Sequence, residues 1–424
     1  MPKAEHPASF ERKDGIQRTL FSAAPLPQAA LDDAQRLACL RLIRSDNVGP
    51  VTFRELINHF GGATAALEAL PELSRRVAGR RPIRICPRDQ AEAELEAAAR
   101  VGAKPIFTIE PSYPAALAHI DVPPPMLYVK GRAELLDRPG VAIVGARNGS
   151  AAGLKLTRHF SSRLGMAGFL VVSGLARGID GAAHEASLAT GTVAVLAGGI
   201  DFIYPPEHAD LHARIGTDGC LVSEMPPGFQ PRGQDFPRRN RIISGIALAV
   251  VVVEAARRSG TLITARMANE QGRLVLAVPG HPLDPRAEGT NSLIKGGALM
   301  VTSPEDILEA VEPLVDGAGS GRFRETAASP QAPPSPAAPP SSGNRMYVAA
   351  DRPGIELRIG ETLSGNALDR VLSALGPAPV DIDELARATA LEIKTVRGAL
   401  LELALAGMIE HHGRQLVSLK SNNL

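Results

Sequence analysis

The chain has 424 residues, with 46 lysines and arginines against 45 aspartates and glutamates, and a formal net charge of +1. This balance excludes a protein that its overall charge draws to nucleic acid or to an anionic membrane, so any anion-binding role must come from local clusters of cations. The three cysteines have no metal or redox spacing, no apolar run is long enough to span a membrane, and charges interrupt the N-terminus, so we expect a cytoplasmic protein with reduced thiols.

Composition along the chain predicts three folded units and two segments without a core. Residues 1–30 are Pro, Ala and charge without periodicity, which predicts a disordered tail. Residues 31–103 predict a helical domain, residues 104–315 an α/β core, and residues 361–424 a winged-helix domain. Between the last two, residues 316–360 include SPQAPPSPAAPPSSG, whose composition favours an extended linker.

The helical domain begins with a helix–turn–helix pattern. Periodic apolar residues in LACLRLI, a turn at Gly49-Pro50 and a second periodic stretch that ends at a Gly-Gly pair predict two helices. This is the shape of a helix-hairpin-helix or a related SAM-like domain. In hairpins that bind DNA, backbone N–H groups at the turn contact a phosphate, but Pro50 removes one such donor. DNA contact and a structural or partner-binding role both stay open here.

Five short apolar runs that alternate with amphipathic stretches indicate the α/β core. The runs are β-branched, almost continuously apolar, and end in Gly or a polar residue, as buried strands do. They cover residues 141–147, 169–176, 192–199, 247–255 and 273–280. Because strands that alternate with helices build parallel sheets, we predict an α/β fold with an extended Rossmann-like, doubly wound parallel sheet.

The last unit has the pattern of a winged helix, with three helices and a β-ribbon. The third helix is predicted over EIKTVRGALLELALAGM and the ribbon over IEHHGRQLVSL. Lys394 and Arg397 lie on that presumed recognition helix, but Glu392 and Glu402 offset their charge. Since a helix that reads a DNA groove is normally more basic, the sequence favours protein contact over DNA contact for this unit.

Arginines gather just past the carboxyl ends of the predicted strands, where open parallel sheets bind their ligands. Small residues there let backbone N–H groups approach an oxyanion, and arginine forks match phosphate oxygens. Spread over several loops, these groups fit a phosphodiester backbone better than one phosphate, and Phe236 is placed to stack on an exposed base. The predicted DNA-binding residues are Gly145, Ala146, Arg147, Ser173, Gly174, Arg177, Gly178, Arg232, Phe236, Arg238, Arg239, Asn240, Arg241, Ser259, Gly260 and Thr261.

Other interpretations of this edge lack parts or remain as competitors. Any single arginine of the cluster has a competing interpretation as a structural ion pair. The sequence has no G-x-x-x-x-G-K-[ST] loop, its first strand turn is G-A-R-N-G-S rather than G-x-G-x-x-G, and it has no G-x-S-x-G elbow. His184, His208 and His281 have no metal-ligand spacing. We therefore predict no catalytic residue, no metal and no cofactor.

Several ordered motifs resemble those of the DprA/Smf family of DNA-processing proteins. They include PSYPAALAHIDVPPPMLYVKG, VSGLARGIDGAAHEASL, FPRRNRIISGIA and VVVEAARRSGTLITARMANEQGR, within about residues 111–298. One departure is VLAGGID, where many members have Gly-Cys-Gly or Gly-Thr-Gly. The resemblance implies a non-enzymatic homodimer that binds single-stranded DNA and delivers the RecA recombinase onto incoming DNA during natural transformation.

The same resemblance assigns particular residues to the DNA site. It implies that the family's DNA-contact motif falls on Gly145, Ala146 and Arg147, and that Arg177 is the basic position of the A-R/K-G-I-D block. The F-x-x-R-N-R block places Phe236 with Arg239 and Arg241 at the same pocket, with Arg232 as a further candidate.

Two alternatives from other classes of protein stay open. One is a nucleotide-processing enzyme such as a nucleoside-monophosphate phosphoribohydrolase, because VEAARRSGT is similar to the Gly-rich phosphate loop of that group. The P-G-G-x-G-T-x-x-E arrangement of those enzymes is absent. The other is an adaptor whose terminal domains contact proteins and whose central pocket is vestigial.

Overall fold

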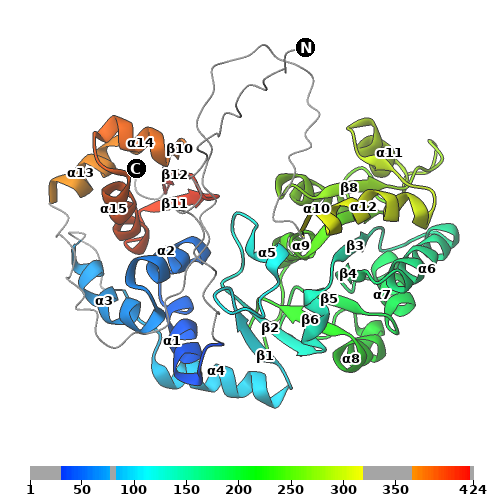
Figure 1. The fold of residues 1–424 in the computed structure, drawn as a ribbon, viewed down its shortest axis with the longest axis horizontal. Helices are drawn as coiled ribbons and strands as arrows, with labels where there is room; N and C mark the ends of the chain where they lie inside the picture. The colour runs from blue at the N-terminus through cyan, green and yellow to red at the C-terminus, as the bar shows by residue number, and fades with distance from the viewer. Residues whose placement is uncertain (1–29, 77–82, 319–364, 421–424) are drawn as a thin grey trace, which may run out of the picture.

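The structure, a computed structural model, divides into a helical part, a sheet-based core and a small C-terminal unit (Figure 1). The residues that it describes are 30–76, 83–318 and 365–420. Except for residues 30 and 316–318, the predicted tail and linker lie outside the described residues. Within the described segments, every helix is too short or too polar to cross a bilayer.

The helical part confirms the predicted helix–turn–helix. Its helices are α1 (Asp33–Ile43), α2 (Pro50–Phe60), α3 (Ala63–Arg76) and α4 (Arg88–Arg100). A capping box between Asp32 and Gln35 begins α1, and Pro50 occupies the first turn of α2, where its missing N–H costs nothing. Helix α2 ends at Gly61, whose φ of 75° is a left-handed conformation that glycine adopts without strain.

The core is built on one sheet, and the prediction of a doubly wound parallel sheet is confirmed. Its nine strands are β1 (Lys104–Phe107), β2 (Met126–Gly131), β3 (Gly140–Val144), β4 (Leu170–Ser173), β5 (Thr192–Leu196), β6 (Cys220–Ser223), β7 (Ala247–Val252), β8 (Leu274–Ala277) and β9 (Leu299–Met300). The spatial order is β1-β2-β6-β5-β4-β3-β7-β8-β9. Neighbours from β6 to β9 run parallel, whereas β1 and β2 extend the sheet in antiparallel pairs.

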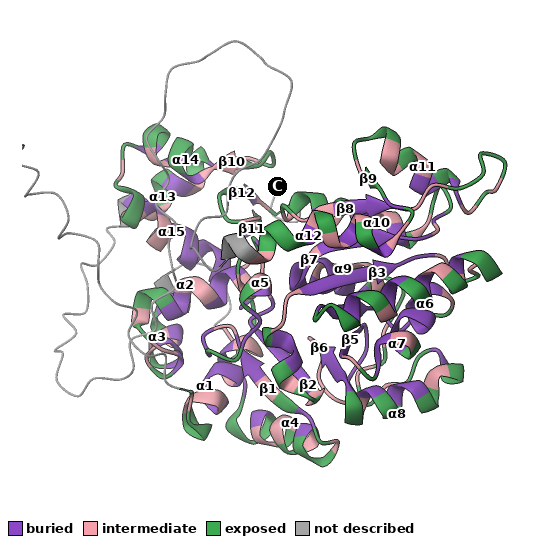
Figure 2. Cartoon of the chain, turned by 45° about the vertical axis from the view of Figure 1, so that its right-hand side comes forward, coloured by how far each residue is buried: buried purple, intermediate pink, exposed green. Residues whose placement is uncertain are grey.

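Helices cover both faces of this sheet, which explains why its strands are apolar throughout. Along β3, Val141 and Ile143 pack into one apolar cluster, whereas Ala142 and Val144 pack into the other. The first cluster includes α6, α7 and α12, and the second includes α5, α9 and α10 (Figure 2). The core helices are α5 (Ala115–Ala118), α6 (Ala151–Met166), α7 (Ile179–Ser187), α8 (Ala209–Asp218), α9 (Asp235–Ile246), α10 (Gly260–Glu270), α11 (Glu288–Lys295) and α12 (Pro304–Ala318), with short 3-10 helices η1 (Ala133–Asp137) and η2 (Pro206–His208).

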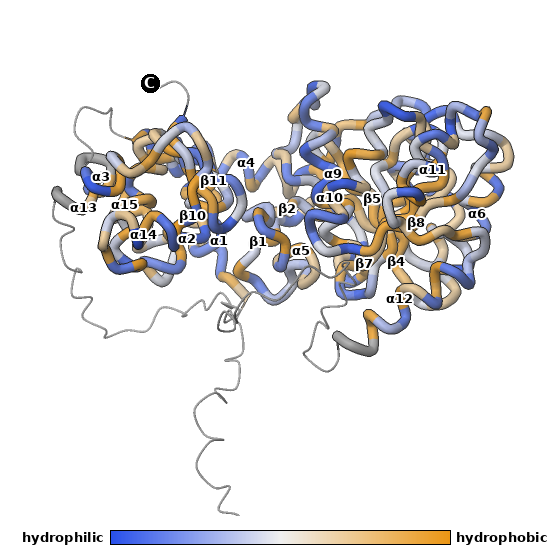
Figure 3. The backbone as a smooth tube through the Cα atoms, turned by 90° about the horizontal axis from the view of Figure 1, so that it is seen from above, coloured by the Kyte–Doolittle hydropathy of each residue, from blue (hydrophilic) through white to orange (hydrophobic). Residues whose placement is uncertain are grey.

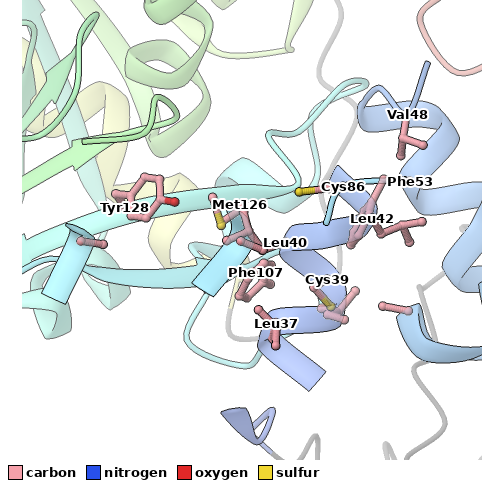
Figure 4. Close-up of a cluster of buried hydrophobic side chains, with 14 of the residues drawn as sticks. Leu37, Cys39, Leu40, Leu42, Val48, Phe53, Cys86, Phe107, Met126 and Tyr128 are labelled. Carbon is pink, nitrogen blue, oxygen red and sulfur yellow. The ribbon is translucent and has the colours of Figure 1, made fainter. Parts of the chain in front are cut away.

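A third apolar cluster joins the helical part to the antiparallel end of the sheet (Figure 4). Leu40 of α1 and Phe53 of α2 belong to it together with Phe107 of β1 and Met126 of β2. The buried thiol of Cys39 lies in the same cluster, where burial, with Glu110 nearby, raises its pKa to about 12. The helical part and the core therefore share one continuous interior.

The C-terminal unit is a winged helix, as predicted. It contains α13 (Gly365–Ala374), α14 (Ile382–Thr389) and α15 (Ile393–Leu405), with a sheet of β10 (Val380–Asp381), β12 (Leu416–Leu419) and β11 (Ile409–His412). This unit lies against the helical part, away from most of the sheet (Figures 1 and 3). Leu401 and Leu405 of α15 join the apolar cluster of α1, α2 and α3, and Asn47 Nδ2 donates a hydrogen bond of 2.8 Å to the Leu405 carbonyl.

Candidate nucleic-acid interface

The strand order changes direction between β3 and β7, and the loops that follow these two strands lie at the carboxyl edge of the sheet, where open parallel sheets bind their ligands. The two loops are tied together. Ser150, after β3, donates from its backbone N–H (2.9 Å) and its hydroxyl (2.5 Å) to the Glu254 carboxylate after β7. Thr261 Oγ1 donates to the Gly145 carbonyl over 3.1 Å. These bonds hold the two loops in a fixed position relative to each other.

Carboxylates of the protein occupy two of the helix N-termini at this edge. Ser150 caps α6, and Glu254 adds its negative charge there. At α7, the buried Asp180 carboxylate accepts from the N–H groups of Gly174 (3.1 Å) and Ala176 (3.4 Å). The Gly174 N–H, which the sequence predicts to approach a ligand oxyanion, thus donates to a carboxylate of the protein.

Arg239 is the most deeply placed of the predicted arginines. It is 8% exposed, and its Nη1 donates to the carbonyls of Gly174 (2.6 Å) and Val195. Burial lowers its pKa to about 10, against the opposing attraction of Asp180. Arg239, predicted as a DNA contact, thus donates to carbonyls at the ends of β4 and β5.

Arg241 and Arg238 share a carboxylate, as the competing interpretation proposed for single arginines. Arg241 Nη2 lies 2.7 Å from Glu224, and its Nη1 donates to the Val122 carbonyl over 2.7 Å. Arg238 lies 3.2 Å from the same Glu224, but its side chain is 51% exposed. Arg241 is thus held within the protein, whereas Arg238 keeps one side open to solvent.

Small residues of the predicted motif serve close packing. Gly178 has φ 74°, and a Cβ there would lie 2.4 Å from the Ala146 carbonyl oxygen. A Cβ on Gly174 would lie 2.8 Å from the Arg239 guanidinium. The buried Ser173 hydroxyl donates to the Ile143 carbonyl over 2.7 Å. These positions shape the edge from beneath.

Four predicted residues lie where α9 meets α10. Ser259 caps α10 by accepting from the N–H of Thr261, and Gly260 begins that helix in an exposed position. Asn240 accepts from Arg239 Nε and has its Nδ2 3.5 Å from the Gly260 carbonyl. Through Asn240, the buried Arg239 side chain is connected to the exposed start of α10.

An exposed cation and two aromatic rings form a group at the carboxyl edge of the sheet. The Arg147 guanidinium lies 5.8 Å from the centre of the Phe236 ring, and Phe236 meets Tyr204 edge-on at 5.3 Å. Tyr204 is 42% exposed. Sequence reasoning missed Tyr204, although a tyrosine that follows a buried strand in a chain with only four tyrosines is a usable signal.

Further arginines of the prediction are exposed around this group. Arg177 pairs with Glu207 at 2.5 Å, with both side chains more than half exposed, and Arg232 is exposed in the segment before α9. Among the described residues, no group of three or more His, Cys, Asp or Glu side chains could hold a metal ion. The chemistry of the edge is that of exposed guanidinium groups beside aromatic faces.

Comparison with known families covers most of the described chain. Residues 33–97 match the model of the DprA-like N-terminal HHH domain, residues 104–312 that of DNA recombination-mediator protein A, and residues 361–413 that of the DprA winged helix domain.

Individual relatives agree with these matches. Protein Smf of Synechocystis is 35% identical over 324 residues, which cover 71% of this chain and 76% of the relative. DNA processing protein DprA of Bacillus subtilis is 46% identical over 200 residues, 46% of this chain and 67% of the relative. The X-ray structure of DNA processing protein A from Streptococcus pneumoniae aligns with a TM-score of 0.55 and 30% identity, over 66% of this chain and 98% of that one. The chain belongs to the DprA/Smf family of DNA-processing proteins.

Proposed function

We propose that the protein binds single-stranded DNA at the carboxyl edge of its sheet and acts as a recombination mediator, not as an enzyme. The observation that carries this proposal is the exposed group of Arg147, Phe236 and Tyr204. Proteins that bind single strands combine cations that follow the backbone with aromatic rings on which bases stack. In a duplex the bases are already stacked on each other, so this group favours the single strand.

The arginines of the edge divide into two roles in this proposal. Arg147, Arg177 and Arg232 contact phosphates, because their guanidinium groups are exposed. The exposed pair of Arg177 with Glu207 opposes this little, since such pairs contribute only about 0–1 kcal/mol. Arg239 and Arg241 position the loops, because protein carbonyls and Glu224 take up their donors.

The phosphoribohydrolase alternative fits this edge less well. A nucleotide-processing site on a Rossmann-like fold places a substrate phosphate at a helix N-terminus. Here Glu254 lies at the N-terminus of α6 and Asp180 at that of α7. Two fixed carboxylates in these places repel a nucleotide phosphate, whereas they leave the outer arginines free to follow a strand.

The proposed mediator works as a homodimer with RecA as its partner. The edge strand β9 supports the dimer, because Leu299 and Met300 are 48% and 59% exposed beside an open row of backbone groups. A second copy that covers this edge would bury both side chains. Membership of a family whose model is described as a recombination mediator supports RecA as the recipient of the DNA.

A direct test measures the affinity for a fluorescent oligo-dT and for a matched duplex over a range of salt concentrations, without added nucleotide. We expect tight, salt-sensitive preference for the single strand. Arg147→Ala and Arg177→Ala should each weaken binding for all sequences and lower the salt slope by about 1, because each removes a phosphate contact. Arg132→Ala, an exposed arginine at the opposite edge of the sheet, is the matched control. Unchanged affinity for oligo-dT in both Arg147→Ala and Arg177→Ala contradicts the proposal. Nucleotide turnover by the pure protein would support the enzyme alternative.

A further inference from the structure

A small cavity lies where the winged helix meets the helical part, two units that lie side by side in Figure 1. Thr52 and Glu55 of α2 line one side. Arg397 of α15, His411 of β11 and Arg414 of the following turn line the other. The remaining wall is apolar. Two arginines and a histidine from one domain thus face the first turns of a helix from another.

Two nitrogen atoms of this lining have no hydrogen-bond partner. They are Arg397 Nε and His411 Nδ1, and both are fully shielded from solvent. The described residues contain only five buried side-chain atoms in this state, and two of them belong to this one cavity. Buried polar groups in native proteins are nearly always hydrogen-bonded, so a pair of orphans beside one cavity indicates a missing acceptor.

The surroundings of the cavity carry an excess of positive charge. Arg54 lies close by, and burial followed by repulsion from Arg414 and Arg397 lowers its pKa, against the attraction of nearby carboxylates. Burial, with Arg54 next, also lowers the pKa of His411 to about 4. Glu55 lines the same cavity, but its charge is offset by Arg54. An anion at this place would relieve the repulsion among the arginines.

Main-chain carbonyls fix the outer cations without neutralising them. Arg414 Nη2 donates to the carbonyls of Ile120 (2.7 Å) and His119 (3.1 Å), and Arg54 Nη1 donates to that of Asp121 (3.3 Å). The Asp121 carboxylate lies 3.7 Å from Arg414 and is 71% exposed, so water screens it. Both guanidinium groups are therefore held in place, and most of the charge of Arg414 is unbalanced, whereas Glu55 offsets that of Arg54.

We propose that this cavity binds one phosphate group, with Arg397 Nε, the His411 ring and the Arg414 guanidinium as its donors. A tetrahedral oxyanion offers several acceptors to convergent N–H groups and matches the arginine fork. Because its ligands come from the winged helix and its cationic neighbour Arg54 from α2, the bound phosphate holds the winged helix on the helical part. The phosphate belongs to free inorganic phosphate or to a nucleic-acid backbone. This inference does not rest on DNA binding by the core.

The test titrates the full chain with inorganic phosphate, at constant ionic strength in chloride, by calorimetry and by thermal unfolding. We expect saturable binding and a rise in the unfolding temperature. Arg397→Gln should weaken phosphate binding at least about tenfold, since a charged donor is lost. Arg387→Gln, an exposed arginine on α14, should leave it unchanged. Arg397→Lys retains the charge but lacks the Nε donor, so it should also bind phosphate poorly.

Solution scattering of each variant shows whether the winged helix stays docked, so that undocking is not mistaken for loss of the site. Wild-type protein that responds to phosphate no more than to chloride overturns the proposal, as does equal binding by a docked Arg397→Gln variant. An oligonucleotide added to the Arg147→Ala protein identifies the source. Displacement of bound phosphate assigns the site to a nucleic-acid phosphate, and absence of displacement assigns it to the free ion, and both results support the site.

Discussion

Two regions of this protein have the sequence pattern of a nucleic-acid contact, and the fold treats them in opposite ways. At the carboxyl edge of the sheet, Arg147 is exposed in the loop after β3 and lies beside Phe236, which is half-buried at the start of α9. In the winged helix, α15 is packed on both of its apolar sides. Leu403 lies in the interior of the winged helix, and Leu405 lies in that of the helical part.

The difference teaches that a DNA-binding motif predicts a fold but not which of its faces is free. Helix α15 has the length and position of a recognition helix, yet its contacts with α2 and α3 occupy part of its surface. Its charge is also nearly balanced, as the sequence indicated. The sheet edge, by contrast, uses carboxylates such as Glu254 to fix its inner layer and leaves guanidinium groups outside.

The largest effect is expected from a substitution that disrupts the packing of α15. Leu405→Ala removes a side chain with 0% exposure from the joint interior and should lower the free energy of unfolding by about 2–5 kcal/mol. Affinity for oligo-dT should stay unchanged, because the sheet edge is elsewhere. Urea unfolding and fluorescence titration of the same preparation measure both. Ile393→Ala, at the exposed start of the same helix, is the control and should change stability by less than about 0.5 kcal/mol.

The next substitution should lower the affinity for DNA and leave the stability almost unchanged. Phe236→Ala should weaken oligo-dT binding by about 1–3 kcal/mol if a base stacks on the ring. Stability should hardly change, because Phe236 is only half-buried. Fluorescence anisotropy gives the affinity, and Met166→Ala, an exposed apolar residue at the far end of α6, is the control. A loss of stability without a loss of affinity would move Phe236 from the binding surface to the interior.

Most of the fold could be predicted from the sequence, because continuous apolar runs indicate buried strands. All five predicted strands are present as β3, β4, β5, β7 and β8. The strands β1, β2, β6 and β9 were not predicted, and β9 has only two residues, too few for a pattern. The site was less predictable. Arg238 and Arg239 are neighbours in one cationic run, yet Arg238 is half exposed and Arg239 is buried, because only the packing of α9 against the sheet separates them.

The third expected effect concerns pH, and each region offers a histidine to test it. His184 lies beneath the sheet edge, where its ring is bonded to the Leu175 N–H and to Thr192. Burial lowers its pKa from 6.5 to about 3. At pH values between about 3 and 6.5, His184 is protonated in the unfolded chain but stays neutral in the folded protein. The stability that neutral His184 contributes is therefore complete above about pH 6.5 and is lost as the pH falls, by up to about 1.4 kcal/mol per pH unit.

His184→Gln should flatten this acid slope for the core, while the slope that His411 causes in the winged helix persists, since burial lowers the pKa of His411 to about 4. Hydrogen exchange followed between about pH 6.5 and about pH 4 separates the two regions, because it reports the opening of each element. His159→Gln, an exposed histidine on α6, is the matched control. An acid slope in β4 and β5 that survives His184→Gln would mean that the protonation of another group opens the sheet edge.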